Sequence, residues 1–483
     1  MSVATATARR LFAVLARWPV LAYVCAIIVA LGLAYFVVRI PVQRSDGLAN
    51  LFQVQEGSWY EVAKGGIASG YMRPALWLQI KLAFHLADGN YTAVFRAIHA
   101  AQIVACGLLF VGALRVRDRA ALCAVPFGLA LLFGSHTFDG TIREAYPINT
   151  YLTIVVACLA AFTLSQGQRA WWRDAAAVVL FVVALFTVET GVLVAVVFAI
   201  MRAAGARGVS RQALLCCAAT LAVYSLGRVL LLGGATPGLS ERVSGFGFRV
   251  LEPQELQARF GAFPYLFYLY NVTSQVLTVL LSEPSGGMFT FTASVLAGAV
   301  RPAHVIYTAT VLASTVLIVA FVVSRRAAWR RYEFSHEDRI VLVFLGVLLA
   351  NALVSFPYTK DVIMSPAGVF YALAASVAIG HQLYRLADLP RMAVMRAVVV
   401  LALLGSAAAI RLMAVHYQMR AASFVTRNDW TELDAWARNN HIDLTVAERA
   451  ALARQLFNDA INRRTPAPRF TEREAGPFRR LLF

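Results

Sequence analysis

Long apolar segments alternate with polar turns along most of the chain. Segment 175–201 carries Glu189 near its middle, and a carboxylate inside a bilayer costs about 2.5–3.5 kcal/mol. We therefore predict two short helices that meet at 187–191 and leave Glu189 at the membrane surface. With these two, the pattern predicts an all-α, polytopic membrane protein with about eleven (11–13) membrane-spanning helices. The other predicted spans are 19–40, 93–114, 120–134, 147–165, 212–232, 303–323, 340–356, 363–382 and 395–413.

Composition agrees with this pattern. The 483 residues are 59% hydrophobic and 14% charged, whereas a soluble domain has about 25% charged residues. The net charge of +18 does not indicate a nucleic-acid partner, because the arginines gather in short turns between apolar segments. Such basic turns are typical of cytoplasmic loops. We therefore expect a multi-pass protein of a bacterial inner membrane, with a cytoplasmic N-terminus and a retained first span.

Two regions and a tail lie outside the predicted spans. The spans and their loops form a membrane domain over 1–413, with outer loops at 41–92 and 233–302. The run 263–281 could either cross the membrane or lie at its interface, and the sequence leaves both open. Residues 414–483 are predicted to form a short, soluble, helical tail. An odd number of spans places this tail on the outer side.

The first outer loop contains a predicted interfacial helix. Its apolar positions lie on one stripe, and Lys81, His85 and Asp88 lie on another. This is the pattern of an amphipathic helix that lies along a membrane surface. Pro74 stands near its predicted start, where proline is favoured. The apolar stripe is Leu76, Ile80, Ala83, Phe84 and Ala87.

The isolated charged residues of the chain lie mainly in the predicted outer loops. A carboxylate there can deprotonate an acceptor hydroxyl or hold a divalent cation. Arginine and lysine can bind the phosphate of a lipid-linked donor. Each residue also has an ordinary structural alternative, such as a turn, a helix cap or a local ion pair. The candidates are Asp46, Arg73, Asp139, Arg143, Glu144, Glu189, Arg228 and Lys360.

Four stretches, in this order, resemble the GT-C fold glycosyltransferases, and among them the O-mannosyltransferase-like members. Tyr71-Met72-Arg73-Pro74-Ala75-Leu76 followed by Phe95-Arg96-Ala97-Ile98-His99 is similar to their "Tyr-x-Arg-Pro-Leu … Phe-His-x-x-Asn" pattern. Phe133-Gly134-Ser135-His136 with Glu144-Ala145 resembles their second outer loop. Leu185-Phe186-Thr187-Val188-Glu189-Thr190 resembles a "Leu-x-Ser-Lys-Glu-Thr" element. Ser365-Pro366-Ala367-Gly368 lies where a late "Leu-Pro-Ser" turn stands in that family.

The resemblance implies a polytopic enzyme that uses a polyprenyl-phosphate sugar. It implies that Asp46 is the catalytic base, that Glu144 or Asp139 is the second-loop acid, and that Glu189 is a third acidic position. The candidates for the donor phosphate are Arg73, Arg228, Lys360 and Arg143. Many members have an acidic pair where this chain has Asp46 followed by glycine. The metal requirement is therefore open, with a divalent cation as one alternative.

These patterns lead to one functional hypothesis and two alternatives. The hypothesis is transfer of a sugar from a polyprenyl-phosphate donor to a glycan, lipid or protein acceptor at the periplasmic face. One alternative is a transporter or flippase of a lipid-linked saccharide. A transporter is expected to place ionisable residues along a path near mid-membrane, whereas here they gather at one face. The other alternative is a scaffold of this fold with a degenerate site.

Overall fold

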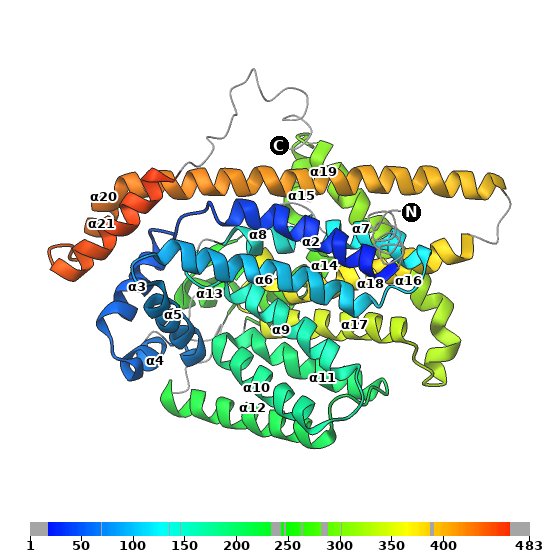
Figure 1. Ribbon diagram of the computed structural model, residues 1–483, viewed down its shortest axis with the longest axis horizontal. Helices are drawn as coiled ribbons and strands as arrows, with labels where there is room; N and C mark the ends of the chain where they lie inside the picture. Colours follow the sequence, from blue (N-terminus) through cyan, green and yellow to red (C-terminus); the bar gives the residue numbers. More distant parts are fainter. Residues whose placement is uncertain are drawn as a thin grey trace, which may run out of the picture.

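The computed structural model describes residues 18–463, except 69, 135, 145, 233–242, 246–247, 262–263, 282–287, 301 and 387–390. Helices dominate it, and most run roughly along one axis between two ends of the molecule (Figure 1). The helices that occupy the predicted spans are α2 (Trp18–Val37), α6 (Tyr91–Leu114), α7 (Arg119–Gly134), α9 (Thr150–Ser165), α10 (Trp171–Thr187), α11 (Leu193–Ala203), α12 (Arg211–Leu231), α16 (Pro302–Arg330), α17 (His336–Val354), α18 (Ser365–Leu386) and α19 (Arg391–Asp429).

Several of these helices have the properties of membrane spans. By length and composition, five helical stretches in the described part of the chain could cross a membrane. A helical membrane protein is therefore the class that the structure supports, and the number of crossings stays a prediction. The five stretches are Trp18–Val37, Tyr91–Leu114, Arg211–Leu231, Thr308–Arg330 and Val362–Arg385.

In the described residues, strands occur only in the hairpin of β1 (Val243–Gly245) and β2 (Phe248–Leu251).

The predicted break at 187–191 is present. Helix α10 ends at Thr187, the 3-10 turn η1 spans Glu189–Val192, and α11 then begins. The chain turns sharply because Gly191 packs against α10, where an added Cβ atom would lie 2.2 Å from the Ala184 carbonyl carbon. Any larger residue would therefore force the two helices apart.

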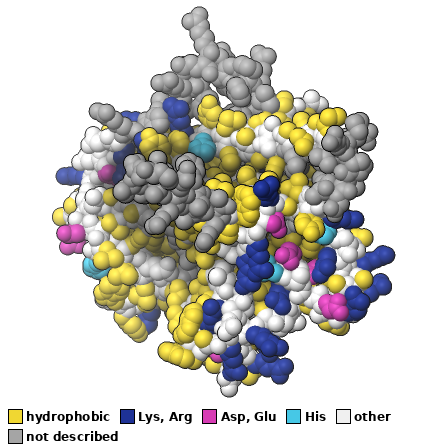
Figure 2. All heavy atoms as spheres, turned by 45° about the vertical axis from the view of Figure 1, so that its right-hand side comes forward, with side chains coloured by type: hydrophobic (Ala, Val, Ile, Leu, Met, Phe, Trp, Pro, Cys, Tyr) yellow, Lys and Arg dark blue, Asp and Glu magenta, His cyan; other side chains and the backbone are white. Residues whose placement is uncertain are grey.

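Basic turns gather at the end of the helices opposite this break, which we call the basic end. There Ser210 N donates to Asp174 Oδ1 at 2.8 Å, and Arg339 Nε donates to the Ala204 carbonyl at 3.0 Å. Figure 2 brings this side of the molecule forward, and Lys and Arg side chains gather there beside a broad hydrophobic surface. Arginines at one end of apolar helices are the arrangement that the sequence predicts for a cytoplasmic face.

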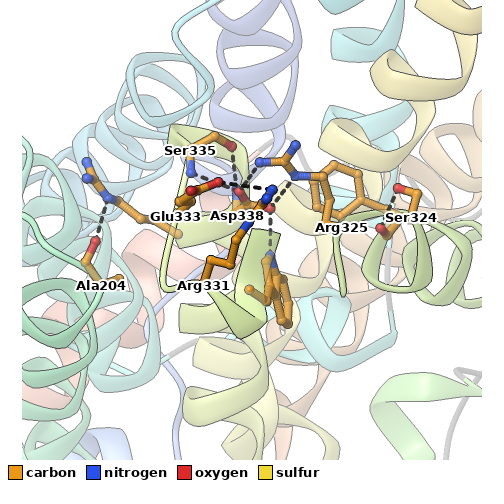
Figure 3. Close-up of polar contacts among 10 residues, drawn as sticks. Ala204, Ser324, Arg325, Arg331, Glu333, Ser335 and Asp338 are labelled. Carbon is orange, nitrogen blue, oxygen red and sulfur yellow. Dashed lines mark hydrogen bonds and ion pairs between the residues drawn. The ribbon is translucent and has the colours of Figure 1, made fainter. Parts of the chain in front are cut away.

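One buried carboxylate holds the turn between α16 and α17 at the basic end (Figure 3). Asp338 is fully buried and accepts four hydrogen bonds from three residues. Arg325 donates at 2.7 and 3.0 Å, Trp329 Nε1 at 2.7 Å and Ser335 N at 2.8 Å. The Ser335 hydroxyl in turn accepts from Asp338 N, which completes a capping box at the start of α17. A charge can be buried here because every bond it needs is supplied.

The first predicted outer loop and the C-terminal segment meet at the other end, which we call the loop end (Figure 1). Side chains from both regions form one hydrophobic cluster, which includes Leu48, Phe52, Ile80, Trp430 and Leu456. Helix α19 also runs without a break through residue 414, the predicted start of the tail. The remaining elements are α3 (Asp46–Glu56), α4 (Trp59–Ala68), α5 (Pro74–Ala87), α8 (His136–Arg143), α13 (Pro253–Phe260), α14 (Tyr265–Leu280), α15 (Met288–Leu296), η2 (Asp361–Met364), η3 (Trp430–Glu432), α20 (Leu433–Asn439) and α21 (Ala447–Asn462).

Helix α5 begins at Pro74, as predicted, but the expected polar position of Lys81 is wrong. Lys81 is buried, and its ammonium donates to the Val54 carbonyl at 2.7 Å and to the Gly57 carbonyl at 2.8 Å. These bonds satisfy carbonyls at the C-terminus of α3, where a cation also suits the helix dipole. The exposed face of α5 instead carries Leu78, Leu82 and Leu86.

Helix α14 corresponds to the run whose placement the sequence leaves open. Its buried face is unusually polar, because Asn271, Ser274, Gln275 and Thr278 all point into the protein. Asn271 Nδ2 donates to the Phe356 carbonyl at 2.8 Å. This helix is therefore packed against the protein along one side, and its placement across the membrane or at the interface stays a prediction.

Candidate active site

Two arginines from distant segments share one carboxylate at the loop end. Arg73, the residue before α5, donates to Glu189 from Nε at 3.0 Å and from Nη2 at 2.6 Å. Arg228, near the end of α12, donates from Nη1 at 3.2 Å. All three side chains are mostly buried, and the Glu189 side chain is 26% exposed. We call Arg73, Glu189 and Arg228 the arginine triad.

The arginine triad carries one surplus positive charge, since two guanidinium groups face one carboxylate. Burial opposes ionisation of Glu189, but the charge and hydrogen bonds of Arg73, together with the charge of Arg228, lower its pKa below the ordinary value. Glu189 is thus held in its ionised form. A carboxylate with a low pKa and two bound cations is a weak base, so this geometry favours an organising role for Glu189.

Local packing fixes where the arginine triad forms. The break after α10 presents Glu189 at the loop end, and α5 docks beside that break because Gln79 Nε2 donates to Thr187 Oγ1 at 2.9 Å. Tyr71 lies against the guanidinium of Arg73, which is 4.4 Å from the ring centroid. An aromatic face and a carboxylate together restrict the rotamers of an arginine and prepare its remaining N–H groups for an anion.

Asp46 lies in a second group of residues at the loop end. It is exposed and begins α3, where the positive end of the helix dipole favours a carboxylate. The Tyr146 hydroxyl donates to Asp46 Oδ2 at 3.0 Å. The neighbouring Gly47 packs closely, because an added Cβ would lie 3.6 Å from Pro147 and 3.4 Å from Val42. The loop after α8 therefore sits directly against the start of α3.

Glu144 lies near Asp46 but, unlike Asp46, is mostly buried. The guanidinium of Arg96 in α6 holds its loop by donating to the carbonyls of Glu144 at 3.2 Å and Tyr146 at 2.6 Å. Burial raises the pKa of the Glu144 carboxyl to about 7, and Asp46 raises it further, against the opposing charges of Arg96, Lys360 and Arg143. The two carboxyl groups therefore differ, since Asp46 is open to solvent and Glu144 holds a proton at mildly acidic pH.

The raised pKa of Glu144 predicts a pH-dependent stability. The folded protein keeps this proton up to about pH 7, whereas the unfolded chain loses it near the ordinary value of 4.5. Stability should therefore fall as the pH rises between these values, by at most about 3 kcal/mol. We expect Glu144→Gln to gain in melting temperature relative to the wild type between about pH 5 and about pH 8. A difference that is the same at both pH values would contradict this assignment.

The arginine triad and the group around Asp46 and Glu144 lie at the same end of the protein. Tyr151, at the start of α9, lies close enough to Glu144, Arg73 and Glu189 to feel their charges. Of the other predicted residues, Lys360 is exposed, and both Lys360 and Arg143 lie close enough to Glu144 to affect its ionisation. The side chains of Asp139 and Asp361 are outside the described residues. Seven of the eight predicted residues thus lie at the loop end.

Several residues of the site have no counterpart in the sequence-based prediction. Tyr71 stands in the stretch that resembles the glycosyltransferase pattern but was not itself a candidate, and Tyr146 and Tyr151 carry no local signal beyond standing near charged residues. Arg96 has one, because a charge inside an apolar span is itself an indication of function. Arg96 is also 3.1 Å from His99 Nδ1, one helical turn further on.

The comparisons with known proteins add no assignment to this site. No family model matches the chain, and neither the curated proteins nor the solved structures contain a match. Among the described residues, no three His, Cys, Asp or Glu side chains are grouped closely enough to hold a metal ion.

Proposed function

We propose that this protein is a membrane glycosyltransferase that moves a sugar from a polyprenyl-phosphate donor to a glycan, lipid or protein acceptor. One observation carries the proposal. An exposed carboxylate, Asp46, shares one end of an apolar helical bundle with an arginine triad that has a surplus positive charge. A base for a hydroxyl and a cationic site for a phosphate are the two groups that this transfer needs.

The proposed reaction is a single displacement with inversion. Asp46 takes the proton from the acceptor hydroxyl while that oxygen bonds to the anomeric carbon of the sugar. The bond between this carbon and the phosphate oxygen breaks, and its electron pair leaves with the polyprenyl phosphate. Arg73 and Arg228 stabilise the negative charge on the phosphate, and Glu189 holds both guanidinium groups in place. Asp46 is the base in this scheme because it is exposed, whereas Glu144 is mostly buried.

The remaining predicted residues have supporting roles in this proposal. Lys360 and Arg143 add positive charge near Glu144, which suits an anionic donor. Glu144 is the second-loop acid, with Asp139 as the alternative that the sequence offers for this position. A divalent cation near these carboxylates is one alternative in the proposed chemistry.

In the proposed arrangement, the eleven helices at the predicted spans cross a bacterial inner membrane. The basic end faces the cytoplasm, and the site faces the periplasm. The exposed leucines of α5, together with Trp59 and Tyr60 of α4, support contact of the first loop with lipid. Leucine and aromatic side chains are favoured where a helix lies in a membrane interface.

A transfer assay tests the proposed function. The purified full-length protein is incubated with a panel of polyprenyl-phosphate monosaccharides and acceptor candidates, and sugar release and polyprenyl phosphate are both measured. We expect release from one donor, with one polyprenyl phosphate formed for each sugar. Tight binding of a donor without release would overturn the enzymatic proposal and favour the transporter or the degenerate scaffold.

A further inference from the structure

The C-terminal segment is packed into the same core as the loop that carries Asp46. Trp430 is fully buried between the two regions, and Leu452, Leu456 and Ala460 of α21 contact the same cluster. Arg449 of α21 also pairs with Glu56 at the far end of α3, with Nη2 2.8 Å from Oε2. This segment is therefore packed directly against the loop that carries Asp46.

Hydrogen bonds from the C-terminal segment converge on the residues that lead into Asp46. Trp430 Nε1 donates to the Val42 carbonyl at 2.8 Å, and Ser423 Oγ donates to the Arg39 carbonyl at 2.9 Å. Arg463 Nη1 donates to the Val38 carbonyl at 2.6 Å. In the other direction, Arg44 Nη1 donates to the carbonyl of Asp429. We call residues 38–44 the approach segment.

Residues 38–40 of the approach segment are hydrogen-bonded back to α2, but residues 42–44 have little structure of their own to fix their position. The approach segment lies between the end of α2 and the start of α3. Within the described part of the chain, Val42, Gln43 and Arg44 take part in no backbone–backbone hydrogen bond. Backbone groups in such a segment must find partners elsewhere, and here Trp430 supplies one for the Val42 carbonyl. Trp430 reaches the chain four residues before Asp46, which makes it the nearest of the three donors.

We propose that Trp430 is a positioning residue, which holds the approach segment and thereby places Asp46 against the acceptor. The inference rests on the proposed function, because it assigns Asp46 the role of base. Arg73 and Arg228 bind phosphate from other elements, so loss of the Trp430 contact should leave donor binding intact. A misplacement of about 1 Å can lower a rate about a hundredfold. The C-terminal segment therefore acts on turnover and not on donor affinity.

The test compares Trp430→Phe with Gln455→Leu in the full-length protein. Trp430→Phe keeps an aromatic side chain but removes the donor to Val42. Gln455→Leu also removes one hydrogen bond between the C-terminal segment and the first loop, but at Gly89, far along the chain from Asp46. For Trp430→Phe we expect kcat to fall about tenfold or more with KM for the donor unchanged. Gln455→Leu should keep both parameters.

A second measurement does not depend on sugar transfer. Brief digestion with trypsin, followed by mass spectrometry, measures cleavage after Arg44, which reports local opening of the approach segment. We expect faster cleavage in Trp430→Phe and the wild-type rate in Gln455→Leu. If the wild type transfers no sugar, the proposed function fails, and cleavage alone decides whether Trp430 holds this segment.

Three results would overturn the inference. The first is wild-type cleavage after Arg44 in Trp430→Phe. The second is an unchanged kcat in an otherwise active Trp430→Phe protein. The third is an equal fall of kcat in Gln455→Leu, because that would show a general requirement for packing of the C-terminal segment.

Discussion

Asp46→Asn is expected to abolish sugar transfer while leaving the protein folded and able to bind its donor. Asparagine cannot accept the acceptor proton, and loss of a general base typically lowers a rate by about a hundredfold to ten thousandfold. The asparagine Oδ1 atom can still accept the hydrogen bond from Tyr146. Since Asp46 is exposed, the change in folding free energy should stay within about 0.5 kcal/mol. The measurements are kcat, donor affinity and melting temperature.

Asp88→Asn is the matched control for this prediction. Asp88 is an exposed carboxylate in the same loop and has a left-handed backbone with φ of 40°, which asparagine tolerates. It should transfer sugar at the wild-type rate. Wild-type turnover in Asp46→Asn would refute the assignment of Asp46 as base. A loss of turnover in both variants would show that the loop responds to any change in charge.

Arg73→Met is expected to weaken both donor binding and folding. It removes the surplus positive charge of the arginine triad and leaves Glu189 with Arg228 alone. A charged hydrogen bond contributes about 1.5–3 kcal/mol, so the dissociation constant of the donor should rise about tenfold to a hundredfold. The folding cost should be about 1–3 kcal/mol, below that of a fully buried pair, because Glu189 is 26% exposed. Donor titration and thermal unfolding measure the two effects.

The double variant Arg73→Met/Glu189→Gln separates these effects. It removes one charge of each sign, so folding stability should recover in large part, and Arg228 keeps one surplus positive charge. Donor affinity should still stay below that of the wild type, because the hydrogen bonds from Arg73 to the phosphate are missing. The matched control is Arg325→Met/Asp338→Asn at the basic end, which breaks an equally close pair far from the site. That control should lose stability and keep donor affinity. Recovery of wild-type donor affinity together with stability in the Arg73 double variant would show that Arg73 makes no bond to the donor and only balances the charge of Glu189.

The local pattern of the chain was enough to predict its long apolar helices, but not the short helices α8 and α13 of its polar segments. Apolar periodicity and breaks identified a helix at each predicted span, and the cost of placing Glu189 in lipid predicted the break between α10 and α11. The same local pattern identified the isolated charged residues that became the candidates for the site. It was wrong for Lys81, because the carbonyls of Val54 and Gly57 that accept its hydrogen bonds lie more than twenty residues away.

The partners of the site residues were decided only by the tertiary structure. Arg73 and Glu189 are 116 residues apart, and Trp430 and Val42 are 388 apart. Periodicity records which face of a helix is apolar, but it carries no record of which distant helix packs there. The sequence alone therefore determined a helical membrane protein with its charges in the loops. Folding decided that two arginines share one carboxylate, and that the end of the chain holds the segment before Asp46. The physical reason is that long-range contacts depend on how whole helices pack, and no local stretch encodes that packing.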